Sequence, residues 1–251
     1  MDQGRIGQAA ELLVGARQGN GLLGEIPPAC RPNSVAEAHA VQDAVTKLLG
    51  ESVGAFKAAA PPNDEAWRGV IYGRTIWASP ARVPVAQVPN CGVEAEVAFR
   101  FRQDLPARAA AYSRDEVAAA VDACAAIEVI TSRFKDQAAR GTLEKLADCV
   151  SNGGFVYAAP VADWRHLDFA TIHVTLASNG QVLVDQDGGH PTRDPLGTAV
   201  ALVNMMREGG GVRAGQFVTC GSYTGMRFLK PGDRCTARFE GLGEAEVTFA
   251  T

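Results

Sequence analysis

The chain has 251 residues, 47% of them hydrophobic and 21% charged, which is ordinary for a globular protein with a substantial core. Its formal net charge of −4, with acidic and basic residues interspersed, excludes the basic footprint of a protein that binds nucleic acid or an anionic membrane. No apolar run approaches the roughly 20 residues of a membrane span, the first residues lack the layout of a signal peptide, and the six cysteines form no C-x-x-C pair. We therefore expect a cytoplasmic protein with reduced cysteines.

Two helices are predicted at the start of the chain. Residues 3–17 place their apolar side chains on one helical face. Residues 35–49 do the same. They follow Ser34 and Glu37, which have the spacing of a capping box, and precede Gly50, which favours the backbone conformation that ends a helix.

From residue 51 the pattern changes to short segments separated by proline and glycine. Strands are predicted at 53–57 and 70–77, with a loop at 61–64 between them. We therefore place a boundary near residue 65, which separates a helical N-terminal region, 1–65, from a strand-rich body, 66–251.

The middle of the chain combines strands with one further helix. Prolines make residues 80–89 an irregular or edge-strand approach to the next strand. Ser113 and Glu116 form a second capping-box pattern, which predicts an Ala-rich helix as far as about Ala125, followed by a strand at 126–130.

The last part of the chain is mostly strand and turn. Asn179-Gly180 is the strongest short hairpin signal that a sequence offers, and it stands between strands predicted at 172–176 and 182–184. The other predicted elements are a helix at 198–207 and strands at 234–239 and 244–249. The pattern predicts a mixed α/β (α+β) protein, with a strand-rich body behind a helical front end.

Two glutamates stand one residue apart inside the apolar strand predicted at 93–99. Alternate side chains of a strand point to opposite faces, so Glu94 and Glu96 lie on one face while the other face is apolar. The pattern alone is weak evidence of function, because Glu244 and Glu246 repeat it near the end of the chain. That second pair is expected on a solvated edge strand.

A third glutamate distinguishes the first pair from the second. Glu128 lies in an apolar segment, where an unpaired carboxylate would be costly to desolvate. Together with Glu94 and Glu96 it would supply three hard oxygen ligands, the set that suits Mg²⁺ or Mn²⁺. The alternative is a buried ion pair of Glu128 with Arg133 or Lys135.

Five motifs occur in a recognisable order along the chain: VEAEVA (93–98), AIEVITSR (126–133), LADCVSNG (146–153), GHP (189–191) and KPGD (230–233). In this order they resemble the 2-oxopent-4-enoate hydratase family, which groups with the 4-oxalocrotonate decarboxylases in the fumarylacetoacetate hydrolase superfamily. The likeness extends to residues 34–45, which are similar to the N-terminal helix of that family.

The resemblance implies a fumarylacetoacetate hydrolase-like fold, a mixed β-sandwich roll in which residues 66–251 form the catalytic domain. It also implies a Mg²⁺ or Mn²⁺ ion bound by Glu94, Glu96 and Glu128. Family members act on small 2-oxo or 2-hydroxydienoic acids from the degradation of aromatic rings, and they generally form homo-oligomers. The chemistry agrees, because a 2-oxo acid chelates a divalent ion that can stabilise an enolate.

Matches to the family also nominate catalytic and substrate-binding residues. Lys57 is the expected catalytic residue, and its apolar neighbours are expected to lower the pKa of its ammonium group into a useful range for proton transfer. The alternative is a surface lysine. Ser151 and Thr224 match positions of the substrate site, although Ser151 could instead stabilise a turn. Asp148 is expected to support the site, and His190 to be structural.

The chain departs from the family pattern where the substrate would be covered. The segment between Lys57 and Tyr72 is short and lacks an acidic residue of the family, and Cys149 replaces an asparagine. We hypothesise that Trp67 or Arg68 reshapes this cover and so changes the acid that is accepted.

The leading interpretation is a lyase that adds water to a 2-hydroxydienoate, with Lys57 managing the protons. The alternatives, in order, are a 4-oxalocrotonate-type 2-oxo acid decarboxylase, an acylpyruvate carbon–carbon hydrolase and a noncatalytic homologue. The hydrolase ranks third because its usual Glu-His pair would have to be Glu37 and His39, which are too close on one helix to face each other well.

Overall fold

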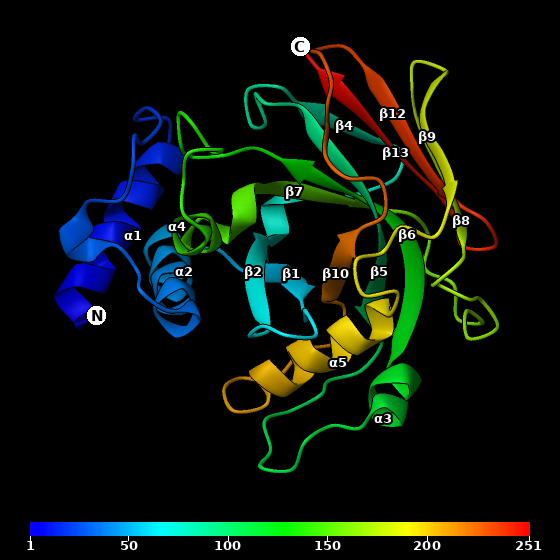
Figure 1. The fold of residues 1–251 in the computed structure, drawn as a ribbon, viewed down its shortest axis with the longest axis horizontal. Helices are drawn as coiled ribbons and strands as arrows, with labels where there is room; N and C mark the ends of the chain where they lie inside the picture. Colours follow the sequence, from blue (N-terminus) through cyan, green and yellow to red (C-terminus); the bar gives the residue numbers. More distant parts are fainter.

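Two helices form the N-terminal end of the computed structural model, which describes residues 1–251. Helices α1 (Gln3–Arg17) and α2 (Val35–Leu49) have the predicted bounds and lie side by side (Figure 1). The Ser34 hydroxyl accepts the Glu37 N–H, and Gly50 ends α2 with φ 64°, both as expected. Glu37 does not return the cap to Ser34, because its carboxylate accepts from the Asn33 N–H and the chain amino group.

Two sheets make up the body of the molecule. The larger has eight strands in the order β2-β1-β10-β5-β6-β7-β3, with β11 paired to β5, and the smaller has the order β4-β13-β12-β8-β9. Their bounds are β1 (Val53–Ala59), β2 (Trp67–Tyr72), β3 (Ile76–Ala78), β4 (Ala81–Pro84), β5 (Gly92–Phe101), β6 (Val121–Ile130), β7 (Asn152–Tyr157), β8 (His173–Ser178), β9 (Gln181–Asp187), β10 (Phe217–Ser222), β11 (Arg227–Phe228), β12 (Arg234–Phe239) and β13 (Gly243–Ala250). The remaining helices are α3 (Arg114–Ala119), α4 (Thr142–Ala147) and α5 (Pro195–Met206). None of the helices combines the length and the apolar character that crossing a membrane requires.

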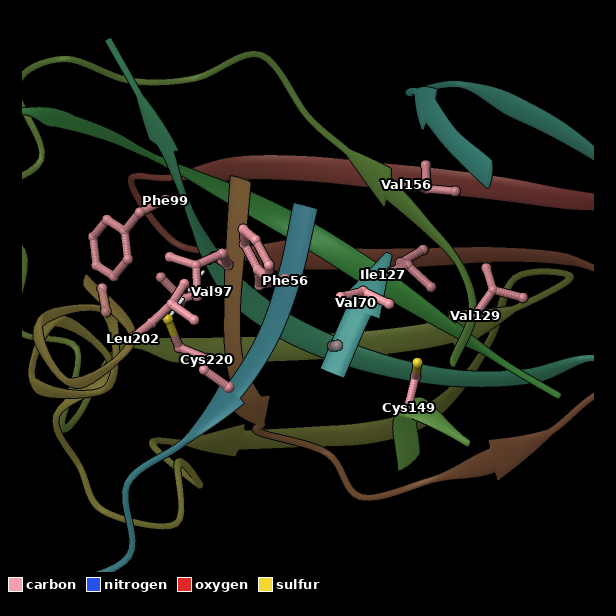
Figure 2. Close-up of a cluster of buried hydrophobic side chains, with 14 of the residues drawn as sticks. Phe56, Val70, Val97, Phe99, Ile127, Val129, Cys149, Val156, Leu202 and Cys220 are labelled. Atoms are coloured by element: carbon pink, nitrogen blue, oxygen red, sulfur yellow. Dashed lines mark hydrogen bonds between the residues drawn. The ribbon is translucent and has the colours of Figure 1, made fainter. Parts of the chain in front are cut away.

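The larger sheet curls so that its two faces have different surroundings. Strands β2 and β7 contact each other although four strands separate them in the sheet order. The outer face packs against helices and the second sheet through a cluster of 58 buried residues, part of which is drawn in Figure 2. The inner face carries a separate cluster of seven: Ala55, Ile71, Ala98, Cys124, Ala126, Phe155 and Phe217. Polar side chains on this inner face therefore lie next to a small, closed apolar layer.

Several predicted elements are confirmed. Strands β8 and β9 form the expected hairpin, and Asn179 and Gly180 at its turn have φ 50° and 81°, as a tight hairpin turn requires. Ser113 and Glu116 form a reciprocal capping box at α3. The confirmed list also includes α5, β12, β13 and the edge strand β4.

Three predictions are corrected. Helix α3 ends at Ala119 instead of about Ala125, because β6 begins at Val121 and pairs with β5 along all ten residues, which outweighs the helix propensity of alanine. The single strand expected at 70–77 is divided by a helical turn at Gly73–Thr75. The boundary near residue 65 falls between β1 and β2, which pair antiparallel, so β1 belongs to the sheet and the helical region ends at Gly50.

Candidate metal centre and active site

Three glutamates from two adjacent strands meet on the inner face of the larger sheet. Glu94 of β5 and Glu128 of β6 are direct cross-strand partners, and Glu96 lies two residues further along β5 on the same face. One carboxylate oxygen from each residue lies within 4.8 Å of those of the other two. The structure therefore brings together the three residues that the sequence nominated as metal ligands.

Neighbouring groups orient two of these carboxylates. Oε2 of Glu96 accepts a hydrogen bond from the Thr219 hydroxyl and another, of 2.9 Å, from the N–H of Gly221. Oε1 of Glu128 accepts from the side-chain amide of Asn152 at 2.9 Å. Its second oxygen, Oε2, is buried and has no hydrogen-bond partner. A buried carboxylate oxygen without a partner is costly, and a cation at this point would satisfy it.

The electrostatics of the three carboxylates also favour a bound cation. Burial, together with the charges of Glu128 and Glu94, raises the pKa of Glu96 to about 8. Burial and the neighbouring Glu128 also raise the pKa of Glu94. Carboxylates in such a group resist ionisation unless a positive charge joins them. The donor set, all carboxylate oxygen with one oxygen unsatisfied, fits a hard divalent cation held by Glu94, Glu96 and Glu128.

Lys57 faces the cluster from β1. Its Nζ lies 2.7 Å from Oε1 of Glu128 and donates to the carbonyl of Val150 at 3.5 Å. Burial acts to lower the pKa of Lys57, but the three glutamates outweigh it, so the pKa is raised. The expectation of a lowered pKa was wrong because it counted the apolar neighbours in sequence and not the carboxylates in space.

The structure also identifies the partners of the other nearby charges. Glu128 pairs with Lys57, whereas Arg133, one of its expected partners, binds the side chain and backbone carbonyl of Asp148. Arg133 also donates to the Asn152 carbonyl at 2.8 Å, and Asp148 is fully buried. The ion pair of Arg133 and Asp148 holds the chain segment next to the carboxylate cluster. Asp148 therefore lies where a residue that supports the site was expected.

A left-handed turn lies between that pair and β7. Cys149, Val150 and Ser151 have φ 53°, 50° and 61°, in a region that non-glycine residues rarely adopt and that costs of order 1 kcal/mol for each residue. Gly69 of β2 makes room for the turn, because a Cβ there would lie 3.1 Å from the Cys149 carbonyl oxygen. The turn aims the Val150 carbonyl at Lys57 and buries Ser151, whose Oγ has no hydrogen-bond partner.

The two nominated substrate-binding hydroxyl groups differ. Ser151 has a buried, free hydroxyl group and lies between Val150, whose carbonyl accepts from Lys57, and Asn152, whose amide donates to Glu128. Thr224 uses its hydroxyl within the fold, since Oγ1 accepts the Ala95 N–H at 3.1 Å and donates to the Gly225 carbonyl at 3.2 Å. Of the two, Ser151 is thus the one with a hydrogen bond to offer a ligand.

The histidines are engaged elsewhere. His190 donates from Nε2 to the Cys220 carbonyl at 2.8 Å and is buried, in agreement with a structural role. His39 accepts the Arg68 N–H at 3.0 Å, and burial lowers its pKa to about 4. Since Glu37 is bound by Asn33 and the chain amino group, it does not form a pair with His39.

Sequence reasoning missed Asn152 and Thr219 as supports of the carboxylates. Asn152 belongs to the motif at 146–153, so its position next to Ser151 was a usable signal. Thr219 lies on β10, a strand that was not predicted, and no local pattern connected it with Glu96.

A family model described as fumarylacetoacetate (FAA) hydrolase C-terminal matches residues 50–250. The chain belongs to this family. A 2-keto-4-pentenoate hydratase from Paraburkholderia phymatum is 27% identical over 261 residues, which cover 99% of each chain. A 4-oxalocrotonate decarboxylase from Pseudomonas putida is 27% identical over 204 residues, 72% of this chain and 76% of that one.

Solved structures share the fold. The 4-oxalocrotonate decarboxylase from Pseudomonas putida G7, complexed with calcium and acetate, superposes with a TM-score of 0.84 at 22% identity, covering 99% of this chain and 98% of that one. The same enzyme complexed with magnesium and adipate has a TM-score of 0.81 at 21% identity and the same coverage. The predicted family and the predicted mixed β-roll fold of the fumarylacetoacetate hydrolase type are both confirmed.

Proposed function

We propose that this protein is a divalent-metal-dependent lyase that hydrates a 2-hydroxydienoate to a 4-hydroxy-2-oxo acid. The observation that carries the proposal is the cluster of three glutamate carboxylates within 4.8 Å, bonded to one buried lysine. The full-length similarity to hydratases supports the choice of reaction. Oxygen-only ligands favour Mg²⁺ or Mn²⁺ over zinc, which usually recruits histidine or cysteine.

Each group has a role in this proposal. A divalent ion held by Glu94, Glu96 and Glu128 would supply Lewis-acid polarisation of a 2-oxo acid. Lys57 keeps a proton at Nζ, held by Glu128 and the Val150 carbonyl, and can present another N–H to the substrate. Ser151 offers its free hydroxyl group to the substrate carboxylate or to the water that adds. The inner apolar cluster closes the floor of the site to bulk water.

Thr224 is proposed to act at one remove. Its hydroxyl joins β5 to the loop after β10, so it holds the strand that carries Glu94 and Glu96. In this proposal Thr224 positions the metal-binding strand and does not itself contact the substrate.

A decarboxylase of the 4-oxalocrotonate type is the second candidate. The decarboxylases named among the relatives and the shared fold favour it, and the same electron sink would accept the pair released with CO₂. The hydrolase is less well supported because Glu37 and His39 do not meet. A noncatalytic homologue would have to keep three clustered carboxylates without using them.

The decisive experiment follows the ultraviolet absorbance of freshly generated 2-hydroxypenta-2,4-dienoate with Mg²⁺ or Mn²⁺ and with chelator. A metal-dependent loss of absorbance, with water added to the product and no CO₂ released, supports the hydratase. Release of CO₂ from a dicarboxylic substrate favours the decarboxylase instead. No metal-dependent turnover of any dienoate or 2-oxo acid would contradict both and favour the noncatalytic homologue.

Assembly and location complete the proposal. We infer a homo-oligomer, on the strength of the family resemblance, and a cytoplasmic protein that binds no nucleic acid. Light scattering during size-exclusion chromatography measures the mass of the particle in solution. A mass of 26.4 kDa, that of one subunit, would contradict the homo-oligomer.

A further inference from the structure

The carboxylate cluster is open toward one end of its strands. Glu94 is half-buried, whereas Glu96 is 2% exposed and Glu128 is fully buried. On the side of Glu96, the inner face continues into the closed cluster that contains Ala98 and Ala126. A ligand therefore approaches from the Glu94 side, toward the beginning of β5 and the end of β6.

Phe228 stands at that open end. In the pairing of β11 with β5 it lies directly opposite Gly92, and opposed residues point to the same face of a sheet. Gly92 is two residues before Glu94, so the ring lies roughly 7 Å along the strand from that carboxylate position. A Cβ on Gly92 would lie 3.2 Å from Cε1 of Phe228, which shows that the ring lies over the glycine backbone.

The backbone that carries Phe228 is held at both ends of its loop, and the ring itself is 61% exposed. The Leu229 N–H donates to the Cys91 carbonyl at 3.0 Å, just after the phenylalanine. The Tyr223 N–H donates to the Ala95 carbonyl at 2.9 Å, at the other end of the same loop. An exposed aromatic ring on such a backbone provides apolar contact at low cost in side-chain entropy, because phenylalanine has few rotatable bonds.

Three cationic side chains near the site do not reach the ring as free charges. Lys57 is bonded to Glu128, and Arg133 is bonded to Asp148. Arg227 lies opposite Val93, so its side chain leaves from the other face of the pair. A second carboxylate at the far end of a bound acid would meet the apolar ring, and burying a charge against such a surface is unfavourable.

We propose that Phe228 is a specificity-determining residue, whose ring contacts the end of the bound acid farthest from its chelating group and favours an uncharged hydrocarbon end over a second carboxylate. This inference rests on the proposed function only in that the ligand is a 2-oxo acid. It adds a residue that no family motif in the sequence contains, since Phe228 precedes the KPGD motif at 230–233.

The test compares two stable acids of equal chain length by titration calorimetry in the presence of Mg²⁺: 2-oxohexanoate, with an uncharged end, and 2-oxohexanedioate, with a charged end. The wild-type protein is expected to bind the first more tightly. Phe228→Ala should reduce this preference about tenfold, and Phe228→Leu should have a smaller effect. Oxalate, which ends before the ring, should bind equally to all variants.

The matched control is Val182→Ala, which removes another exposed apolar side chain, 54% exposed, from β9 in the other sheet. An unchanged preference in Phe228→Ala, or an equal change in Val182→Ala, would overturn the inference. So would a change in oligomeric state of Phe228→Ala with unaltered binding, because the ring would then belong to a contact between copies. If the protein binds 2-oxo acids but turns over no dienoate or 2-oxo acid, the proposed function is wrong and the role of Phe228 stands. If it turns over a dienoate but Phe228→Ala leaves the preference between the two acids unchanged, the role of Phe228 is wrong and the proposed function stands.

Discussion

The two Glu-x-Glu pairs of this chain have nearly the same local sequence and opposite environments. Glu94 and Glu96 lie on the inner face of the large sheet beside Glu128. Glu244 is exposed and lies opposite Arg238, and Glu246 is half-buried and forms an ion pair with Arg234. The first pair gathers negative charge in a buried place, and the second is neutralised at the surface.

The difference comes from what lies across the strand. The partner of β5 places a third glutamate opposite the pair, while β12 places arginines opposite β13. Strand β13 lies between β12 and β4, so the expectation of an edge strand was wrong, although its glutamates do face outward. A carboxylate pair becomes a candidate metal site when its cross-strand neighbours add charge of the same sign under burial.

The largest contrast is expected for Glu96→Gln against Glu246→Gln. Removing one buried carboxylate ligand should weaken Mg²⁺ or Mn²⁺ binding and lower kcat/KM by at least about 1,000-fold, since Lewis-acid stabilisation amounts to several kcal/mol. Calorimetry and the dienoate assay measure the two effects. Equal activities for the two variants would contradict the claim that Glu96 binds the metal and Glu246 does not.

The second largest effect is expected for a variant of Lys57. Lys57→Met keeps most of the side-chain volume but removes the proton donor and the 2.7 Å contact with Glu128. We expect a loss of about 100-fold in kcat, the scale of general acid–base catalysis, while metal still binds. A variant with full kcat and impaired metal binding would assign Lys57 to the metal site alone.

Variants in the segment expected to cover the site, at Trp67 and Arg68, should have a smaller effect. Trp67 lies on the Lys57 face of the β1–β2 pair, whereas Arg68 faces α2 and binds Asp43 at 2.7 Å. Trp67→Ala should alter relative rates on a panel of 2-oxo acids by up to about tenfold. Arg68→Ala should leave relative rates unchanged and lower the free energy of unfolding by about 1–2 kcal/mol. Unchanged relative rates in both variants would contradict a role of this segment in selectivity.

The protonation of the cluster gives a pH dependence that the surface pair lacks. In the metal-free protein the folded-state pKa of Glu96 is raised from 4.5 to about 8, so the folded chain keeps a proton that the unfolded chain releases. The corresponding stabilisation is full below pH 4.5 and is lost as the pH rises to about 8. With chelator present, the melting temperature should fall over this range more in the wild type than in Glu96→Gln. Saturating Mg²⁺ should reduce the fall, and an identical slope in both proteins would refute the assignment.

The smallest effect is expected at the second pair itself. Glu246→Gln removes an ion pair with Arg234, whose side chain is 59% exposed. Exposed pairs contribute little, so the free energy of unfolding should change by less than about 1 kcal/mol. A larger loss in urea unfolding would show that the surface pair is structural after all.

Local patterns predicted the regular elements that have strong end signals. The capping residues Ser34 and Ser113, the terminating Gly50 and the turn Asn179-Gly180 all act where they were expected to act. The start of β6 was misplaced because alanines that favour a helix in isolation are recruited by pairing with β5. Strands β7 and β10 were missed, and with them the supports that Asn152 and Thr219 give to the carboxylates.

The sequence by itself predicted the family and nominated the three glutamates and the lysine, because the motifs that contain most of them occur in a recognisable order along the chain. Only the tertiary structure decided that the three nominated carboxylates meet on one face of the sheet, and that the pKa of Lys57 is raised and not lowered. It also decided which of Trp67 and Arg68 faces the site and where Phe228 stands. The physical reason is that charge, burial and facing depend on strand pairing between residues far apart in the chain, and local spacing carries no information about those partners.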